Sequence, residues 1–212
     1  MEWELLRTLP PEEVRRLLAS AHRRRFAKRE VLFHEGDPAN ALHLIARGRV
    51  AVRVTTPRGD VATLDVLSAG GIAGEQALVS GEHRRMATVV ALERTETLVI
   101  DEGAFANLCH EHPSIAAAVN QLLATRIRKV DARLLEALYL PVDTRLLRRL
   151  LELGESYGET VPLTQDDLAG MAGTTRATVN RVLRKEEQAG SVALCRGQIK
   201  ILDRSSLIRR AR

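Results

Sequence analysis

Arg176 and Arg181 stand five residues apart in a stretch whose apolar residues recur with helical spacing. A guanidinium group presents its donors as a fork that matches the O6 and N7 acceptors of guanine in the major groove of DNA. This stretch could therefore recognise the edges of DNA bases from a single helix. The residues expected to contact DNA along it are Thr175, Arg176, Ala177, Thr178, Asn180, Arg181 and Arg184.

The flanking pattern predicts the element that would position these side chains. Thr164 and Asp167 have the spacing of a capping box at the start of a first helix, which continues through 168–172. Gly173 can adopt the left-handed conformation of a tight turn, and a second helix is expected over 176–188. Two helices about a short glycine turn form a helix-turn-helix.

A hairpin is expected next, because the apolar runs 192–195 and 198–202 are separated by Arg196 and Gly197. Arg196 and Lys200 place positive charge where such a wing could touch the DNA backbone. Hydroxyl groups suited to phosphate contacts are those of Thr164, Thr175 and Thr178. The alternative for the whole segment is a helical hairpin with a solvated basic face.

Composition narrows the class of protein. The 212 residues carry a net charge of +5, and 140–212 holds 13 Lys and Arg against 9 Asp and Glu, as expected for a segment that meets a polyanion. No apolar run reaches the roughly 18 residues of a membrane span, and the first ten residues lack the apolar core of a secretory signal. We therefore expect a protein of the cytoplasm that does not associate with membranes.

Neither a metal site nor an active site is predicted. Cys109 and Cys195 are the only cysteines and lack metal-ligand spacing. His110 and His112 flank a helix start without a third ligand, and nothing supplies a haem partner for His83. There is no nucleophile–base pair and no P-loop, so we expect the protein not to be an enzyme.

The rest of the chain predicts a β-rich domain followed by a long helix. Between Phe26 and Ile100, short apolar runs alternate with glycine-marked turns, which indicates an all-β sandwich or roll. The stretch 113–140 is helical without a breaker and would be about 40 Å long. Its narrow apolar stripe favours pairing with a second copy; a core helix of one domain is the alternative. The stripe comprises Ile115, Val119, Leu123, Ile127, Val130, Leu134 and Leu138.

Pro141 is expected to break the long helix and mark a hinge. Beyond it, 144–153 is expected to form a helix that ends at Gly154. A polar loop is expected over 155–162.

The helix-turn-helix resembles that of the cyclic-AMP receptor protein / fumarate-nitrate regulator (CRP/FNR) family. Its segment 173–183 resembles the family pattern Gly-x-Ser-Arg-Glu-Thr-Val-x-Arg-x-Leu, in which both arginines match and Ala177 replaces the glutamate. That glutamate accepts from a cytosine amine in the family, so its loss implies a different or more loosely read half-site. The resemblance covers nearly all of the chain and implies an α+β fold. It comprises an N-terminal effector-binding β-roll over 1–112, a jelly roll like those that bind cyclic nucleotides, a dimerisation helix over 113–140, and a C-terminal winged helix-turn-helix over 141–212.

The segment 74–88 resembles the phosphate-binding cassette of the same family, in which an arginine follows Gly-Glu after ten residues. The resemblance implies that Glu75 accepts a ribose 2′-hydroxyl and pairs with Arg126. It also implies that Arg85 holds a cyclic phosphate through two charge-assisted bonds, beside the free N–H groups of a short helix. No permanent cofactor is implied, but a cyclic nucleotide such as cAMP is implied as the effector. The residues expected at this site are Gly74, Glu75, Arg85, Met86, Ala87, Arg126, Val130 and Asp131.

Three of these positions depart from the family pattern. Met86 replaces a phosphate-contacting Ser or Thr, and Val130 and Asp131 replace two hydroxyl residues that recognise adenine across the dimer. These changes predict weak nucleotide binding, recognition of another base, or partial activity without ligand. A regulator that is ligand-independent or responds to another effector is therefore the alternative, with Arg85 paired to Glu75 inside a roll that has lost its ligand.

The resemblance also implies partners and a mechanism. A homodimer would bind a palindromic site on double-stranded DNA with its recognition helices about 34 Å apart. The effector would shift the population toward that arrangement by extending or stiffening 127–140. RNA polymerase is a further implied partner, and the segment 154–162 is short where family activators present their polymerase-contact surface.

Overall fold

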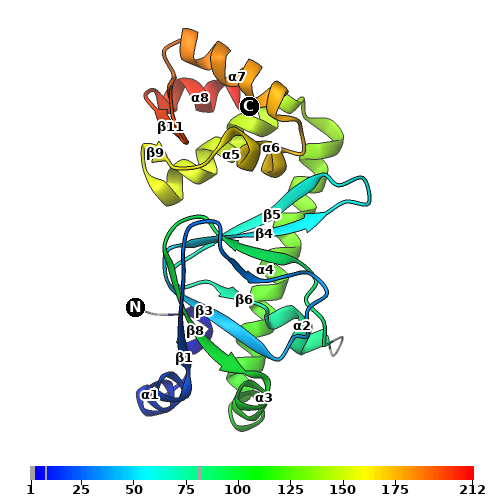
Figure 1. Ribbon diagram of the computed structural model, residues 1–212, viewed down its shortest axis with the longest axis vertical. Helices are drawn as coiled ribbons and strands as arrows, with labels where there is room; N and C mark the ends of the chain where they lie inside the picture. The colour runs from blue at the N-terminus through cyan, green and yellow to red at the C-terminus, as the bar shows by residue number, and fades with distance from the viewer. Residues whose placement is uncertain (1–2, 8, 81–82) are drawn as a thin grey trace. The chain divides into compact units, whose positions relative to one another are not determined.

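The computed structural model describes residues 3–7, 9–80 and 83–212. The chain forms two compact units (Figure 1). Unit 1 comprises the residues up to Val54 together with Leu64–Lys129, and unit 2 comprises Thr55–Thr63 and Val130–Arg212. The predicted fold class, a β-roll with a long helix and a winged helix-turn-helix, is confirmed.

Unit 1 is built on two four-stranded sheets, and the strand pairs described for them are antiparallel. The first sheet has the order β1-β8-β3-β6, with β1 (His22–Phe26), β3 (Ala41–Arg47), β6 (Ile72–Ala73) and β8 (Thr95–Asp101). The second has the order β2-β7-β4-β5, with β2 (Val31–Phe33), β4 (Arg49–Thr55), β5 (Val61–Ser68) and β7 (Thr88–Ala91).

Short helices cover one side of the roll, and Figure 1 shows α1 and α3 at the same end of it. Their bounds are η1 (Glu4–Leu6), α1 (Pro11–Ser20), α2 (Glu75–Ser80) and α3 (Glu102–Glu111). Leu42 and Leu44 of β3 face an apolar cluster shared with η1, α1 and α3. Ile45 faces a second cluster between the two sheets, because successive side chains of a strand point to opposite faces.

The long helix α4 spans Pro113–Tyr139, as the unbroken helical pattern predicts. Its apolar stripe divides into two parts. Ile115 and Val119 are buried in the cluster that covers β3, whereas the positions from Ile127 onward are exposed. The prediction that the stripe pairs with a partner from Ile115 is therefore wrong at its first two positions, because the start of α4 covers the chain's own roll.

Unit 2 contains four further helices and a three-stranded sheet of order β10-β11-β9. Their bounds are α5 (Val142–Tyr157), β9 (Thr160–Val161), α6 (Gln165–Ala172), α7 (Arg176–Gln188), β10 (Val192–Cys195), β11 (Gln198–Ile201) and α8 (Arg204–Arg210). Thr164 and Asp167 form the predicted capping box at the start of α6, and Gly173 after it has the left-handed φ of 63°. The hairpin of β10 and β11 is the predicted wing.

The prediction that Gly154 ends its helix is wrong, since α5 continues to Tyr157 and is capped by Gly158 with φ of 79°. A Cβ at position 154 would lie 2.7 Å from Cδ1 of Ile201. Glycine therefore serves the close packing of α5 against β11 rather than a turn. The predicted loop over 155–162 is likewise interrupted by β9, which pairs with β11.

Partly buried ion pairs join α4 to α5 within unit 2. The side chain of Arg149 is 4% exposed and pairs with Glu136 of α4 and, at 3.0 Å, with Glu152. Arg148 pairs with Glu136 at 2.9 Å, and its Nε donates to the carbonyl oxygen of Ala211. No helix of the described residues has the length and apolar character needed to cross a membrane.

Candidate effector pocket and DNA-binding surface

A pocket of about 360 Å³, part of it open to solvent, lies in unit 1. The wall is mostly apolar, with the ring of Phe33 among its components, and it includes two guanidinium groups. The predicted effector residues that line it are Gly74, Arg85, Met86, Ala87 and Arg126.

Glu75 lies behind this wall rather than in it. Its side chain is 1% exposed and pairs with Arg126, whose Nη2 also donates to the carbonyl oxygen of Ile72 at 2.7 Å. Burial raises the pKa of the Glu75 carboxyl, and the charge of Arg126 partly offsets this rise. The pairing implied by the resemblance is thus the one found, and the alternative pairing of Glu75 with Arg85 is not.

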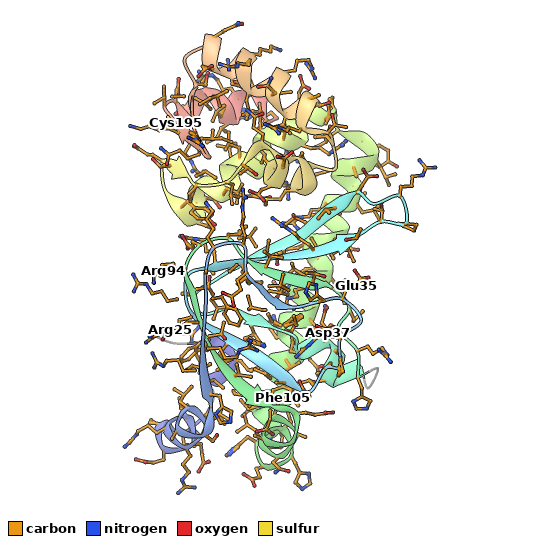
Figure 2. The ribbon with its side chains drawn as sticks, viewed as in Figure 1. Arg25, Glu35, Asp37, Arg94, Phe105 and Cys195 are labelled. Carbon is orange, nitrogen blue, oxygen red and sulfur yellow. The ribbon has the colours of Figure 1, made fainter. Side chains whose placement is uncertain are left out.

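Arg85 is held by backbone carbonyl groups. Its Nη2 donates to Ala41 at 2.6 Å and its Nη1 to Gly74 at 3.3 Å. Gly74 has a φ of +93°, and a Cβ there would lie 2.2 Å from Nη1 of Arg85, so this position requires glycine. The backbone of Arg85 also bonds to Asp37 in the loop after β2, labelled in Figure 2.

Two neighbouring rings, those of Phe33 and His43, lie beside the guanidinium of Arg85. The guanidinium carbon lies 4.1 Å from the centre of the Phe33 ring, a cation–π contact. The ring of His43 follows at 5.6 Å from that of Phe33, and its Nδ1 is 3.1 Å from the hydroxyl oxygen of Thr97. Burial, and then the charges of Arg85 and Arg24, lower the pKa of His43 to about 3. His43 is therefore neutral at physiological pH.

Two polar atoms at this site lack hydrogen-bond partners among the described residues: Nε of Arg85 and Oε2 of Glu75. Unpartnered buried polar atoms are costly, and a bound ligand is one way to satisfy them. Val130 and Asp131 do not line the pocket of their own chain and are exposed on α4. Gly81 and Glu82 of the predicted cassette lie outside the described residues.

The second site is the outer face of α7. Val179, Val182 and Leu183 are buried against the rest of unit 2, which turns the opposite face outward. Thr175 caps the helix, and Thr178 is half-buried. The other predicted DNA-binding residues of α7 are exposed, namely Arg176, Ala177, Asn180, Arg181 and Arg184.

Each arginine of this face lies beside a carboxylate. The pairs are Arg176 with Asp166 at 3.6 Å, Arg181 with Asp143 at 2.8 Å, and Arg184 with Glu187 at 2.7 Å. The three carboxylates come from α6, α5 and α7 itself. Sequence reasoning treated these arginines as free and did not indicate the acidic partners.

The hydroxyl groups predicted to contact phosphate have local roles. The hydroxyl of Thr164 accepts from the backbone N–H of Asp167 and lies 2.7 Å from its carboxylate. Those of Thr175 and Thr178 lie 3.1 Å apart. Arg196 and Lys200 are exposed on the wing, the hairpin whose residue Cys195 is labelled in Figure 2.

Both parts of the chain are similar to known protein families. The cyclic nucleotide-binding domain profile matches residues 23–112, and the Crp-like helix-turn-helix domain profile matches 144–210. The cyclic AMP receptor protein of Thermus thermophilus is 33% identical over 204 residues, which cover 96% of this chain and 94% of that protein. The chain belongs to the CRP/FNR family. It is therefore a DNA-binding transcription regulator.

A further relative and a solved structure are also similar to this chain. The CRP-like cAMP-activated global transcriptional regulator of Mycobacterium tuberculosis is 27% identical over 196 residues, covering 88% of this chain and 87% of that protein. The structure of the c-di-GMP responsive global regulator CLP of Xanthomonas campestris has a TM-score of 0.80 at 22% identity, covering 91% and 99% of the two chains, and confirms the fold. CRP/FNR relatives are transcription regulators, which confirms the prediction that the protein is not an enzyme.

Proposed function

We propose that this CRP/FNR regulator is a homodimer that reads a palindromic DNA site under the control of a small anionic effector, a cyclic nucleotide such as cAMP. The observation that most supports an anionic effector is the buried guanidinium of Arg85 at the pocket wall. Its Nε lacks a hydrogen-bond partner among the described residues. A phosphate group would satisfy that donor. The names of the two relatives given above refer to cyclic AMP, which supports the same class of effector.

The exposed part of α4 supports the homodimer. Ile127, Val130, Leu134 and Leu138 recur every three or four residues and are 61%, 59%, 56% and 65% exposed. A second copy that packs on this stripe would remove it from water. Such pairing would present two α7 helices to one DNA duplex, and Val130 and Asp131 would approach an effector from the partner chain.

The proposal also includes the predicted domain boundaries, protein partner and cellular location. The domains are an effector-binding domain over 1–112, a dimerisation helix over 113–140 and a DNA-binding domain over 141–212. RNA polymerase is the proposed protein partner, and the cytoplasm, where DNA is accessible, is the proposed location.

A second candidate is a regulator with another effector or none. Met86 lines the pocket with a thioether where the family pattern has a hydroxyl, and Val130 cannot hydrogen-bond to a base. Both features weaken the match to adenosine phosphate and leave the anion-binding arginine in place.

Calorimetric titration with cAMP and with cGMP tests the effector. If either binds, Arg85→Ala should weaken binding by about 10- to 100-fold, because charge-assisted bonds to the phosphate are lost. The matched control is Arg84→Ala, since Nη1 of Arg84 donates to Gly36 and its side chain does not line the pocket. An absence of heat at millimolar nucleotide would contradict the cyclic nucleotide and favour the second candidate.

Arg181→Ala tests base reading by α7. Affinity for a duplex selected from a random-sequence pool should fall by about 10- to 100-fold. Affinity for unselected duplex should fall only on the order of threefold, because one phosphate-attracting charge is lost. Fluorescence anisotropy at one fixed salt concentration measures both, with Arg204→Ala on α8 as the control. Equal losses on the two duplexes would remove the base-reading role of Arg181.

A further inference from the structure

The pair of Arg181 and Asp143 has a geometry that the other two pairs on this face lack. Nη2 of Arg181 lies 2.8 Å from Oδ1 of Asp143, and Nη1 lies 3.5 Å from Oδ2. One carboxylate therefore faces both terminal nitrogens of the guanidinium. Asp143 is in the first turn of α5 and Arg181 is in α7, so the contact fixes the arginine relative to a second helix.

The other two acidic residues are placed differently. Asp166 approaches Arg176 through a single contact of 3.6 Å between side chains that are 65% and 70% exposed. Glu187 accepts from the backbone N–H of Leu194 at 3.0 Å as well as from Arg184, so its carboxylate holds the wing hairpin. The side chain of Asp143 is 36% exposed, and its ion pair in the described structure is with Arg181. Of the carboxylates beside the two base-reading arginines, Asp143 is therefore the one that faces both terminal nitrogens of its partner, whereas Asp166 makes one longer contact.

The donor geometry of arginine determines what remains available to DNA. A guanidinium has five N–H donors in one plane. Asp143 faces the edge formed by Nη1 and Nη2. The described residues provide no acceptor for Nε of Arg181, so the edge formed by Nε and its neighbouring terminal nitrogen still offers two parallel donors. Two parallel donors are what O6 and N7 of guanine accept.

We propose that Asp143 is a positioning residue that holds Arg181 with this second edge toward a guanine and raises the selectivity of the protein for its site. The proposal rests on the base-reading role of Arg181. Asp143 adds selectivity in two ways. It restricts the rotamers of Arg181 before DNA binds, and its negative charge opposes DNA phosphates wherever no guanine is present to compensate. A carboxylate that merely blocked Arg181 would have a different effect, since its removal would strengthen binding to the selected site.

The test compares Asp143→Asn with the unaltered protein. Each full-length protein is used to select duplexes from a random-sequence pool. Its affinities for the winning duplex and for unselected duplex are then measured at one salt concentration. We expect Asp143→Asn to bind the winning duplex about fivefold more weakly and unselected duplex about threefold more tightly. The ratio of the two affinities would then fall by more than about tenfold, with loss of preference concentrated at the guanine read by Arg181.

Two further variants separate this role from general effects of charge and folding. Glu155→Gln removes one negative charge from the same unit, but its partner is Arg204, so the ratio should not change. Asp143→Glu retains the charge and should restore most of the selectivity. Thermal melting of each variant establishes that it is folded.

The outcomes distinguish the proposal from the function on which it rests. If the unaltered protein selects a site and Asp143→Asn keeps the same affinity ratio, Asp143 does not position Arg181. Tighter binding of Asp143→Asn to the selected site identifies Asp143 as a blocking group and also overturns the proposal. If the unaltered protein selects no sequence, base reading by Arg181 fails, and the role of Asp143 fails with it.

Discussion

Leu134→Glu is expected to make the protein monomeric at micromolar concentration and to weaken its binding to a palindromic site by about 10²- to 10⁴-fold. Leu134 lies in the exposed stripe of α4, between Val130 and Leu138. A dimer would bury two copies of the new carboxylate without partners, which is costly. Each monomer would then bind one half-site alone and lose the gain from two linked contacts. Light scattering after size exclusion, followed by anisotropy with the selected duplex, measures both effects.

Ala132→Glu is the matched control for this prediction. Position 132 is two residues from 134 and so lies on nearly the opposite side of α4, where its side chain is exposed. It adds the same charge and should leave both mass and affinity unchanged. A Leu134→Glu protein that stays dimeric would show that this stripe is not the dimer interface.

Arg149→Met is expected to lower the free energy of unfolding by about 3 kcal/mol, because it removes the buried partner of Glu136 and leaves that partly buried carboxylate with Arg148 alone. Arg149 is the most buried member of the ion-pair group and contacts both Glu136 and Glu152. Urea unfolding, with the midpoint and slope both determined, measures the loss.

Two variants test the reason for that loss. Arg204→Met breaks a pair whose side chains are well exposed and should cost less than about 1 kcal/mol. Arg149→Met combined with Glu136→Leu removes both charges of the main pair and should recover much of the stability. If Arg149→Met costs no more than Arg204→Met, the contact between α4 and α5 is not an important source of stability.

The parts of unit 2 that sequence reasoning predicted are those with local signals. The capping box of Thr164 and Asp167 and the left-handed turn at Gly173 each involve residues three or fewer positions apart. Such short-range contacts do not depend on the remainder of the fold. The wing was predictable for the same reason, since two short strands flank a two-residue turn.

The errors occurred where a distant segment decides the local structure. Gly154 has the residue type of a helix end, but contact with Ile201 explains the glycine in the interior of α5. Ile115 continues the same periodic stripe as Leu134, yet only Ile115 meets the apolar cluster of the roll. Helical periodicity shows which residues share a face and does not reveal what covers that face.

The residues of the candidate effector site that belong to a sequence motif could be predicted, and those contributed by distant strands could not. The pairing of Glu75 with Arg126 followed from the family resemblance. The contact of Arg85 with Phe33, and of Phe33 with His43, joins a residue of the cassette to strands β2 and β3. No spacing in the sequence predicts these contacts. Asp143 was overlooked because 38 residues separate it from Arg181.

The neutral ring of His43 removes one source of acid response from the proposed effector pocket. A histidine near an anion site ordinarily gains a proton as the pH falls below about 6.5, which adds positive charge and strengthens attraction for the anion. Beneath Arg85, the ring stays unprotonated down to a pH of about 3. His43 therefore adds no positive charge to the proposed effector pocket when the pH falls mildly, and anion binding there gains nothing from this residue.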